Sequence, residues 1–395
     1  MTAAAPVAAR PVIAPERYGA RLEALRERLR DAGADGLLVG PGAELVYLAG
    51  YEAMALERLT MLVVPAQGGA VLIVPRLERE PAESSPAVRA GLATVRTWEE
   101  TEDPYGLVAA ALDSDGAVRG SGPSRLYVGD RSWAMFVLRL QRAFPEASFE
   151  LASSVLRPLR MRKDTEEVAL LRLAARSADR VVAAVTAGPL VGRTERDVAR
   201  EIVARLIAEG HDHAEHSQIV GSGPNSASPH HTASERVIGA GEPVVLDIGG
   251  SLGGYASDIT RTVWVAGPAG TEPDLGFRAI YDAVQRAHGA ALSVARPGTA
   301  CEAIDAAARR VIAAAGHGPH FLHRTGHGIG LEVHEDPYIV AGNREALAPG
   351  MAFSIEPGIY LEGRYGVRIE DIVVCASDSP DVLNEAPRDL RVVAG

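Results

Sequence analysis

Four carboxylates lie inside segments that otherwise have the composition of buried strands. Asp247 follows Val-Val-Leu, Asp258 precedes Ile-Thr-Arg-Thr, Glu356 ends Met-Ala-Phe-Ser-Ile, and Glu370 precedes Asp-Ile-Val-Val. A carboxylate at such a position is costly unless it is paired or bound to a metal, and Arg368 is the one obvious cation beside them. Two divalent cations would neutralise the four charges. The sequence therefore predicts a dinuclear metal site.

The segments also show how the acids could meet. Four glycines between residues 249 and 254 mark a tight turn between the segments of Asp247 and Asp258. A hairpin with such a turn brings two carboxylates side by side. We expect the imidazole ligand to come from the glycine-rich segment 323–334, which contains His323, His327 and His334. Hard oxygen ligands with one imidazole favour manganese, cobalt, iron or zinc over a thiophilic ion.

A histidine pair, His230-His231, follows a loop rich in Ser, Gly and Asn at residues 221–228. Loops of this composition commonly line a functional site. Each residue taken singly also has a simpler interpretation: a strand Asp as a cap or turn residue, a lone His as a core or surface residue, and Arg368 as a salt-bridge partner of Glu370. The joint occurrence of all five ligand contexts, in order, is what favours a metal site.

The pattern of apolar residues divides the chain into two predicted domains and a tail. Residues 1–14 are Ala- and Pro-rich and are predicted to be a disordered tail. Residues 15–155 alternate between helical and strand-like segments, as in an α/β domain. Helices are predicted from Pro15 and near 134–144, with strands at 36–40, 61–64, 71–74 and 126–128.

Residues 156–395 are predicted to form an internally duplicated α+β domain. Asp164 and Glu167 make a capping pair for one helix, and Thr194 opens the next. Two helices followed by strands occur twice in this order, so the strands of both halves should face a common cleft. The first set has strands at 218–220, 244–248 and 259–265; the second has helices at 274–294 and 301–315 and strands at 351–355 and 367–374.

Charge and composition exclude several classes of protein. A formal net charge of −11 disfavours nucleic acid or an anionic membrane as a partner. No apolar run reaches the roughly 18 residues of a membrane span, and the N-terminus lacks a charged region followed by an apolar one. We therefore expect a cytoplasmic protein. Cys301 and Cys375 form no CxxC pair and are expected to be buried thiols.

From about Leu156 to Val393 the sequence resembles the pita-bread metallopeptidases, which include aminopeptidase P, prolidase and methionine aminopeptidase. The matching stretches are Asp247-Ile-Gly and residues 254–262, 323–334, 354–360 and 367–371. The first 155 residues, including Tyr47-Leu-Ala-Gly50, resemble the N-terminal domain of the prolidase, aminopeptidase P and creatinase branch. Methionine aminopeptidases lack that domain, and creatinase lacks the metal ligands. The resemblance implies a creatinase/prolidase-type α/β domain followed by a duplicated pita-bread domain.

The resemblance also implies a role for each site residue. Asp247 would bind one metal ion, Asp258 and Glu370 would bridge the two ions, and His327 and Glu356 would complete the second ion's shell. Glu356 would also carry protons. His230 and His334 would stabilise the tetrahedral intermediate and protonate the leaving nitrogen. On the substrate side, His323 would line the proline pocket, Arg368 would hold a substrate carboxylate, and Tyr360 would hydrogen-bond nearby.

The function implied is hydrolysis of the peptide bond that precedes proline, by a prolidase-type dipeptidase. The short connection between Glu356 and Glu370 favours prolidase over aminopeptidase P, which is the first alternative. A hydrolase of a non-peptide amide and a non-catalytic binding protein on the same fold are further alternatives. Manganese is the first choice of metal, ahead of cobalt, zinc and iron. The expected partners are a proline-containing di- or oligopeptide and a second copy of the chain.

Overall fold

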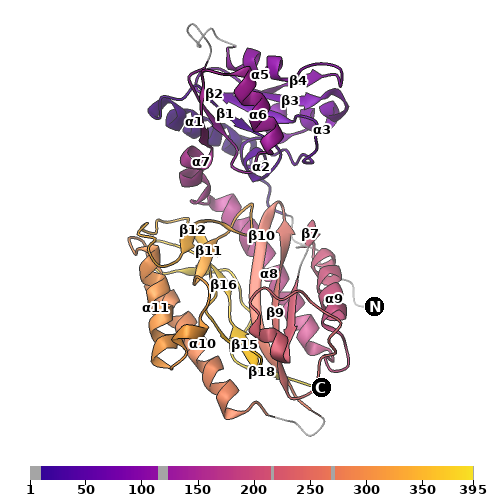
Figure 1. Cartoon of the computed structure of the whole chain (residues 1–395), viewed down its shortest axis with the longest axis vertical. Coiled ribbons are helices and arrows are strands. Elements are labelled where there is room, and N and C mark those ends of the chain that lie inside the picture. The colour runs from indigo at the N-terminus through magenta and orange to yellow at the C-terminus, as the bar shows by residue number, and fades with distance from the viewer. Residues whose placement is uncertain (1–9, 114–122, 215–217, 268–271, 395) are drawn as a thin grey trace. The chain divides into compact units, whose positions relative to one another are not determined.

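The computed structural model describes residues 10–113, 123–214, 218–267 and 272–394 (Figure 1). They form two compact units: an N-terminal unit, Ile13–Arg160, and a C-terminal unit that comprises Met161 onwards together with residues 10–12. The domain boundary predicted at 155/156 falls inside helix α7 (Ser153–Arg160). Val155 and Leu156 are buried where α7 packs on α1 (Pro15–Asp31), so the whole helix belongs to the N-terminal unit.

The structure describes only residues 10–14 of the predicted tail. Residues 1–9 lie outside the described residues. Arg10 belongs to the C-terminal unit, where its Nη1 donates to Asp212 Oδ1 at 2.8 Å. Ile13 is buried in the N-terminal unit. Residues 10–14 contain no helix or strand and lead into α1.

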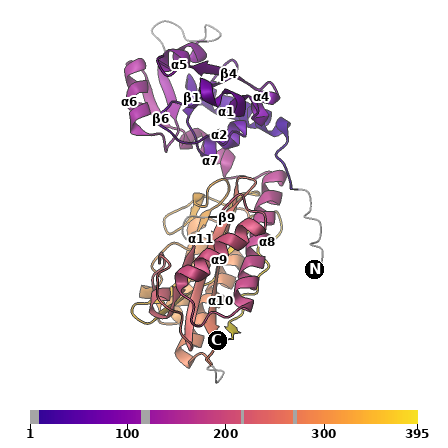
Figure 2. The ribbon, with the colours of Figure 1, turned by 90° about the vertical axis from the view of Figure 1, so that its right-hand side faces the viewer.

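The N-terminal unit is an α/β domain built on one six-stranded sheet of order β4-β3-β2-β1-β5-β6. Its strands are β1 (Gly36–Val39), β2 (Met61–Pro65), β3 (Ala70–Pro75), β4 (Ala93–Trp98), β5 (Arg125–Val128) and β6 (Ser148–Leu151). Helices α5 (Tyr105–Leu112) and α6 (Ala134–Ala143) pack on one face of the sheet around Leu38, Val63 and Leu126. Figure 2 shows α1, α2 (Ala43–Ala49) and α4 (Pro86–Arg89) on the opposite face. The short α3 (Arg79–Glu83) lies between β3 and α4 along the chain.

Four long helices dominate the C-terminal unit: α8 (Thr165–Ala187), α9 (Glu195–Ala208), α10 (Leu275–Val294) and α11 (Cys301–Ala314). Two of them start where the sequence predicts. Asp164 accepts the Glu167 backbone N–H at 2.9 Å, while the Glu167 side chain accepts from the Asp164 N–H. The Thr194 hydroxyl accepts the Asp197 N–H at 3.1 Å. These caps satisfy backbone donors that the helix itself leaves free.

The first sheet of this unit is centred on a long hairpin, β9 (Glu242–Leu252) and β10 (Tyr255–Val265). The short strands β7 (His213–Ala214), β8 (Ile219–Ser222) and β18 (Arg391–Val393) pair at its sides. Only Gly253 and Gly254 form the turn, with φ values of 67° and 79° that glycine adopts without strain. Gly249 lies within β9, where a Cβ would come 2.3 Å from the Ser257 carbonyl oxygen.

The second sheet has the order β12-β11-β13-β16-β17 and a separate hairpin, β14-β15, beside it. Its strands are β11 (Gly326–Gly328), β12 (Glu335–Ile339), β13 (Ala352–Ile355), β14 (Gly358–Leu361), β15 (Tyr365–Arg368), β16 (Asp371–Val374) and β17 (Asp381–Val382). The single strand predicted at 367–374 is thus two strands in different sheets. The break falls at Glu370, whose backbone N–H donates to the Thr260 carbonyl of β10 at 3.1 Å.

Each half of the C-terminal unit has its own apolar core. Helices α8 and α9 pack on β9 and β10 around Val198, Ile202 and Val263. Helices α10 and α11 pack on the second sheet around Phe277, Ile304 and Phe353. The order of two helices followed by strands therefore occurs twice, and Figure 1 shows the two helix pairs flanking the strands. Among the described residues, no helix is both long enough and apolar enough to cross a membrane.

Candidate active site

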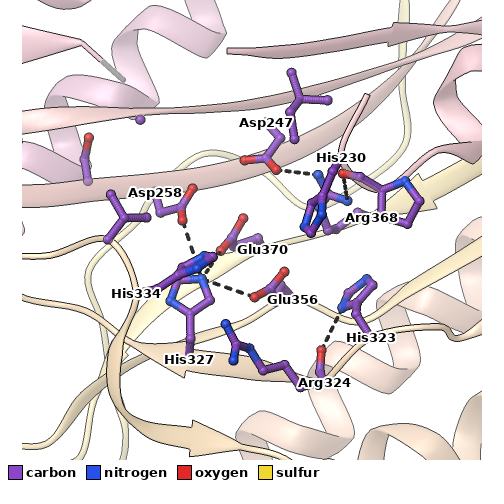
Figure 3. A pocket seen from close by; sticks show the side chains of 15 residues that line it. His230, Asp247, Asp258, His323, Arg324, His327, His334, Glu356, Arg368 and Glu370 are labelled. Atoms are coloured by element: carbon purple, nitrogen blue, oxygen red, sulfur yellow. Dashed lines mark hydrogen bonds and ion pairs between the residues drawn. The ribbon is translucent and has the colours of Figure 1, made fainter. Parts of the chain in front are cut away.

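The five predicted metal ligands lie around one cleft of about 530 Å³ in the C-terminal unit (Figure 3). Asp247 and Asp258 come from the β9-β10 hairpin, in which Asp258 is opposite Gly249 and Asp247 is opposite Thr260. Because side chains alternate along a strand, this register puts both carboxylates on the same face. The second sheet supplies the other three ligands: His327 from β11, Glu356 after β13, and Glu370 before β16.

The ligand atoms converge closely. The His327 Nε2 atom lies 3.2 Å from Glu356 Oε1, 3.6 Å from Asp258 Oδ2 and 3.9 Å from Glu370 Oε1. Glu370 Oε1 is a buried oxygen for which the described residues offer no hydrogen-bond donor. A carboxylate oxygen in that state needs a cation. The donor set, its spacing and this orphaned oxygen therefore fit divalent metal ions.

The electrostatics of the cleft agree with this fit. Burial, and then the charges of Asp247 and Glu356, raises the pKa of Asp258 well above its ordinary value. Burial and then Asp258 do the same to the pKa of Glu370. Burial raises the pKa of Glu356 to about 7, against the opposing charge of Arg368. Without cations these acids cannot all be ionised at neutral pH, so the cleft as built requires positive charge.

His327 is prepared to act as a neutral ligand. Burial, followed by the neighbouring His334, lowers its pKa to about 3, so its contacts with the acids are not ion pairs. Its Nδ1–H donates to the Gly328 carbonyl at 3.1 Å, which leaves the Nε2 lone pair facing the carboxylates. Fixing the tautomer through the other ring nitrogen is the usual way in which proteins orient a metal-binding histidine.

Two hydroxyl groups that sequence reasoning missed hold the acids in place. The Thr260 hydroxyl donates to Glu370 Oε2 at 2.7 Å. The Ser354 hydroxyl donates to Glu356 Oε1 at 3.1 Å and accepts the His327 backbone N–H at 3.0 Å. Both residues lie two positions from a ligand within the same motif, and that spacing on a strand was the signal that could have revealed them.

Arg261 is a third residue whose role the motif did not reveal. It is 4% exposed, and it donates from Nη1 to the Glu370 carbonyl at 2.6 Å and from Nη2 to Asp371 Oδ1 at 2.7 Å. These bonds join β10 of the first sheet to the start of β16 in the second. Arg261 therefore fixes the distance between the two sheets that carry the ligands.

The predicted substrate-side residues are arranged in two groups. His230, His323 and His334 line the cleft, and the His334 ring centroid is 4.0 Å from that of His327. Tyr360 is 3% exposed and outside the cleft lining. Burial, then the charge of Arg368, lowers the pKa of His323 to about 4. The neutral His323 Nε2 can therefore accept the Tyr360 hydroxyl, which lies 2.8 Å away.

Arg368 is held differently from both sequence interpretations. It forms its ion pair with Asp247 rather than with Glu370. It also donates to the Tyr360 hydroxyl at 2.7 Å, to the Thr260 hydroxyl at 3.1 Å and to the Pro229 carbonyl at 3.2 Å. All three guanidinium nitrogens are thus engaged, and the side chain is 3% exposed. A substrate carboxylate would have to displace one of these partners.

The loop that carries His230 is anchored by a buried acid, Glu195, at the start of α9. Its Oε1 accepts from the backbone and hydroxyl of Ser222 at 2.8 and 2.7 Å. Its Oε2 accepts from His231 Nε2 at 2.7 Å and from the Ser234 hydroxyl at 2.6 Å. One carboxylate therefore ties together both ends of the segment 222–234.

Glu195→Gln should lower stability by about 3 kcal/mol at pH 7 and by much less near pH 3. Burial opposes the charge of Glu195, but hydrogen bonds from Ser234, Ser222 and His231 outweigh it and lower its pKa from 4.5 to about 2. The stabilisation is therefore present above pH 4.5 and lost as the pH falls towards 2. Melting temperatures from pH 3 to 7, with a chelator present, measure this difference.

The matched control is Glu235→Gln, which removes an exposed ion pair between Glu235, directly after this segment, and Arg196 of α9. Its effect should stay within about 0.5 kcal/mol at every pH. An equal loss of stability for Glu195→Gln at pH 3 and pH 7 would show that the charge of Glu195 is not what anchors the loop.

The segment beside His334 is held by an ion pair with Lys163, the only lysine in the sequence. Lys163 Nζ contacts Glu335 Oε1 at 2.5 Å, and both side chains are buried. A Cβ at Gly330 would lie 2.5 Å from that same Glu335 oxygen, which explains the glycine at this position. The buried pair thus holds the backbone on which His327 and His334 are mounted.

A cleft of carboxylates and one imidazole that fits divalent metal ions, between two helix-and-sheet halves, is the arrangement of the pita-bread metallopeptidases. Two family models match the chain: metallopeptidase family M24 at residues 169–377, and the creatinase/prolidase N-terminal domain at residues 21–162. The chain therefore belongs to metallopeptidase family M24 and is a hydrolase; members of that family use divalent metal ions. The pita-bread fold implied by the sequence motifs is confirmed.

Three similar proteins cover almost the whole chain. The "Probable dipeptidase PepE" of Mycobacterium tuberculosis is 47% identical over 96% of this chain and 97% of its own length. The "Xaa-Pro dipeptidase" of Lactobacillus helveticus is 34% identical over 94% of this chain and 98% of its own. The crystal structure of dipeptidase PepE from Mycobacterium ulcerans has a TM-score of 0.88 at 45% identity, covering 97% of this chain and 100% of that one.

Proposed function

We propose that the chain is an Xaa-Pro dipeptidase that uses two divalent cations. The proposal is carried by the convergence of Asp247, Asp258, His327, Glu356 and Glu370 in one cleft. It is supported by a relative named Xaa-Pro dipeptidase at 34% identity. The connection between Glu356 and Glu370 is only the β14-β15 hairpin, in agreement with the prolidase type.

Asp247 would hold one cation, Asp258 and Glu370 would bridge both, and His327 and Glu356 would complete the shell of the second. When bound, the cations would polarise the scissile carbonyl as Lewis acids and lower the pKa of a water molecule to near neutrality. Manganese is the expected ion. The homodimer, the absence of a nucleic-acid partner and the cytoplasmic location stay predictions from the sequence.

The side chains of the cleft supply the remaining chemistry. Glu356 accepts the proton of the attacking water, because its carboxylate lies in the cleft and is positioned by the Ser354 hydroxyl. His334 and His230 donate hydrogen bonds to the carbonyl oxygen as it gains charge. The bond before proline is a tertiary amide without an N–H, so the leaving nitrogen must be protonated by Glu356 or one of these histidines. Ile219, Pro229 and Val333 add apolar groups to the lining of the cleft, which suit a proline ring.

A panel of three substrates tests the proposal. Ala-Pro, Ala-Pro-Ala and Ala-Ala are compared with manganese or cobalt present, and kcat/KM is measured for each. Rapid cleavage of Ala-Pro alone is the expected result. A preference for Ala-Pro-Ala would indicate an Xaa-Pro aminopeptidase instead. Equal cleavage of Ala-Ala would refute the specificity for proline, and cleavage of none of the three would direct attention to non-peptide amides.

A further inference from the structure

The cleft contains a second arginine, Arg324, whose guanidinium has no acid partner among the described residues. Arg324 lines the same cavity as the metal ligands, and Figure 3 shows its side chain extending towards His327 and Glu356. It is close enough that its charge acts on both of those residues. The sequence alone does not single out Arg324. The chain has 38 other arginines, and no motif position or spacing distinguishes Arg324 from them.

We infer that Arg324 binds the C-terminal carboxylate of a dipeptide substrate and so makes the enzyme select dipeptides over longer peptides. This inference rests on the proposed peptidase function but not on the proline preference. It moves the carboxylate site from Arg368, the residue favoured by the sequence, to Arg324.

The contrast between the two arginines carries the inference. Arg368 is buried and already has Asp247, Tyr360 and two further acceptors. Arg324 is half-buried, and its guanidinium carbon lies 4.3 Å from the centroid of the Tyr338 ring. Stacking on an aromatic face fixes the plane of a guanidinium while leaving its N–H groups free to donate. That geometry suits bidentate binding of a carboxylate.

The charge balance of the loaded cleft points the same way. Two divalent cations and the four ligand carboxylates cancel, so Arg324 and Arg368 leave the cleft positive. An anionic substrate end is therefore attracted into it. Only a dipeptide places a free carboxylate on the residue directly after the scissile bond. In a tripeptide that position is occupied by a neutral amide, which leaves Arg324 without its partner.

Arg324 is also connected to the pocket histidine. The Nδ1–H of His323 donates to the Arg324 carbonyl oxygen at 2.7 Å. The same His323 ring is held through Nε2 by Tyr360. Both parts of Arg324 thus contribute to substrate binding. Its carbonyl oxygen orients the His323 ring, which lines the pocket, and its guanidinium binds the C-terminal carboxylate of the substrate.

The test compares acid and amide forms of one substrate. Ala-Pro and Ala-Pro-amide are assayed with the manganese-loaded wild type, Arg324→Gln, Arg324→Lys and the control Arg344→Gln, which removes an exposed arginine away from the cleft. The wild type should prefer the acid by about 10- to 100-fold in kcat/KM. Arg324→Gln should lose most of that preference, because its KM rises much more for the acid than for the amide. Arg324→Lys should restore part of it, and the control should behave as the wild type.

Two results would overturn the inference. One is a wild type that cleaves acid and amide equally well. The other is an Arg324→Gln variant that loses the same factor on both forms, which would indicate a merely structural role. The pair Ala-Ala and Ala-Ala-amide repeats the comparison without proline, so a failed proline preference and a failed carboxylate site are distinguished.

A binding measurement makes the inference independent of turnover. Calorimetric titration of the manganese-loaded protein with proline and with prolinamide compares the same two end groups on a product. Proline should bind the wild type more tightly than prolinamide by about tenfold or more, and Arg324→Gln should remove the difference. Equal affinity of the wild type for the two compounds would contradict the inference even if no dipeptide were hydrolysed.

Discussion

Replacing His327 by alanine should lower kcat by about three orders of magnitude, equivalent to roughly 4 kcal/mol of transition-state stabilisation. His327 is the single imidazole among the five proposed ligands, and its Nε2 lies within 4 Å of three acids. Its loss leaves Glu356 and Glu370 to hold a cation with oxygen ligands alone. We expect bound metal to fall by about one equivalent per chain, as measured by elemental analysis after gel filtration.

His320 provides a matched control, because it is an exposed histidine in the segment that precedes β11. His320→Ala should keep both its metal content and its kcat. A His327→Ala variant that retained two equivalents of metal and wild-type turnover would exclude His327 from the metal centre. Loss of activity with full metal content would instead assign it to substrate binding.

Asp371→Ala should destabilise the C-terminal unit by about 3–5 kcal/mol. Asp371 is fully buried beside the ligand Glu370, and Arg261 and Arg388 both contact it. Burial opposes its charge, but Arg261, His288 and Arg388 together outweigh burial and lower the pKa of Asp371 below its ordinary value. Removing it leaves an uncompensated guanidinium in the interior. Chemical denaturation in the presence of a chelator measures the loss without a contribution from bound metal.

Asp381→Ala removes a half-exposed ion pair with Arg172 and serves as the control, with an expected cost below about 1 kcal/mol. Because the stabilisation by Asp371 depends on its charge, it is present above pH 3.8 and is lost as the pH falls below that value. If Asp371→Ala unfolded at the same denaturant concentration as the wild type at neutral pH, the proposed role of the Arg261 network in holding the two sheets together would be wrong.

Local chemistry made much of this fold predictable. The starts of α8 and α9 follow from Asp164 and Thr194, since a capping side chain acts on a backbone N–H only three residues away. The apolar runs of β1, β2 and β3 are equally local signals. The duplication was predictable for a related reason: it appears as an order of elements along the chain, which needs no knowledge of distant contacts.

What the sequence did not predict depends on partners far along the chain. The break between β15 and β16 exists because the Glu370 backbone bonds to Thr260, 110 residues earlier. The domain boundary moves because α7 packs on α1. Arg368 pairs with Asp247 and not with its sequence neighbour Glu370 for the same reason. A long side chain such as Arg324 takes its role from what surrounds it, and only the folded cleft specifies that.

The buried pair of Lys163 and Glu335 has a consequence for chemical modification of this protein. Every other basic side chain apart from histidine is a guanidinium, so the chain carries one ε-amino group, and its side chain is 1% exposed. Among side chains, the lysine amine is the usual target of acylation, glycation and ubiquitin transfer, and it must be accessible to react. While the ion pair stays closed, none of these reactions finds a lysine side chain to attack.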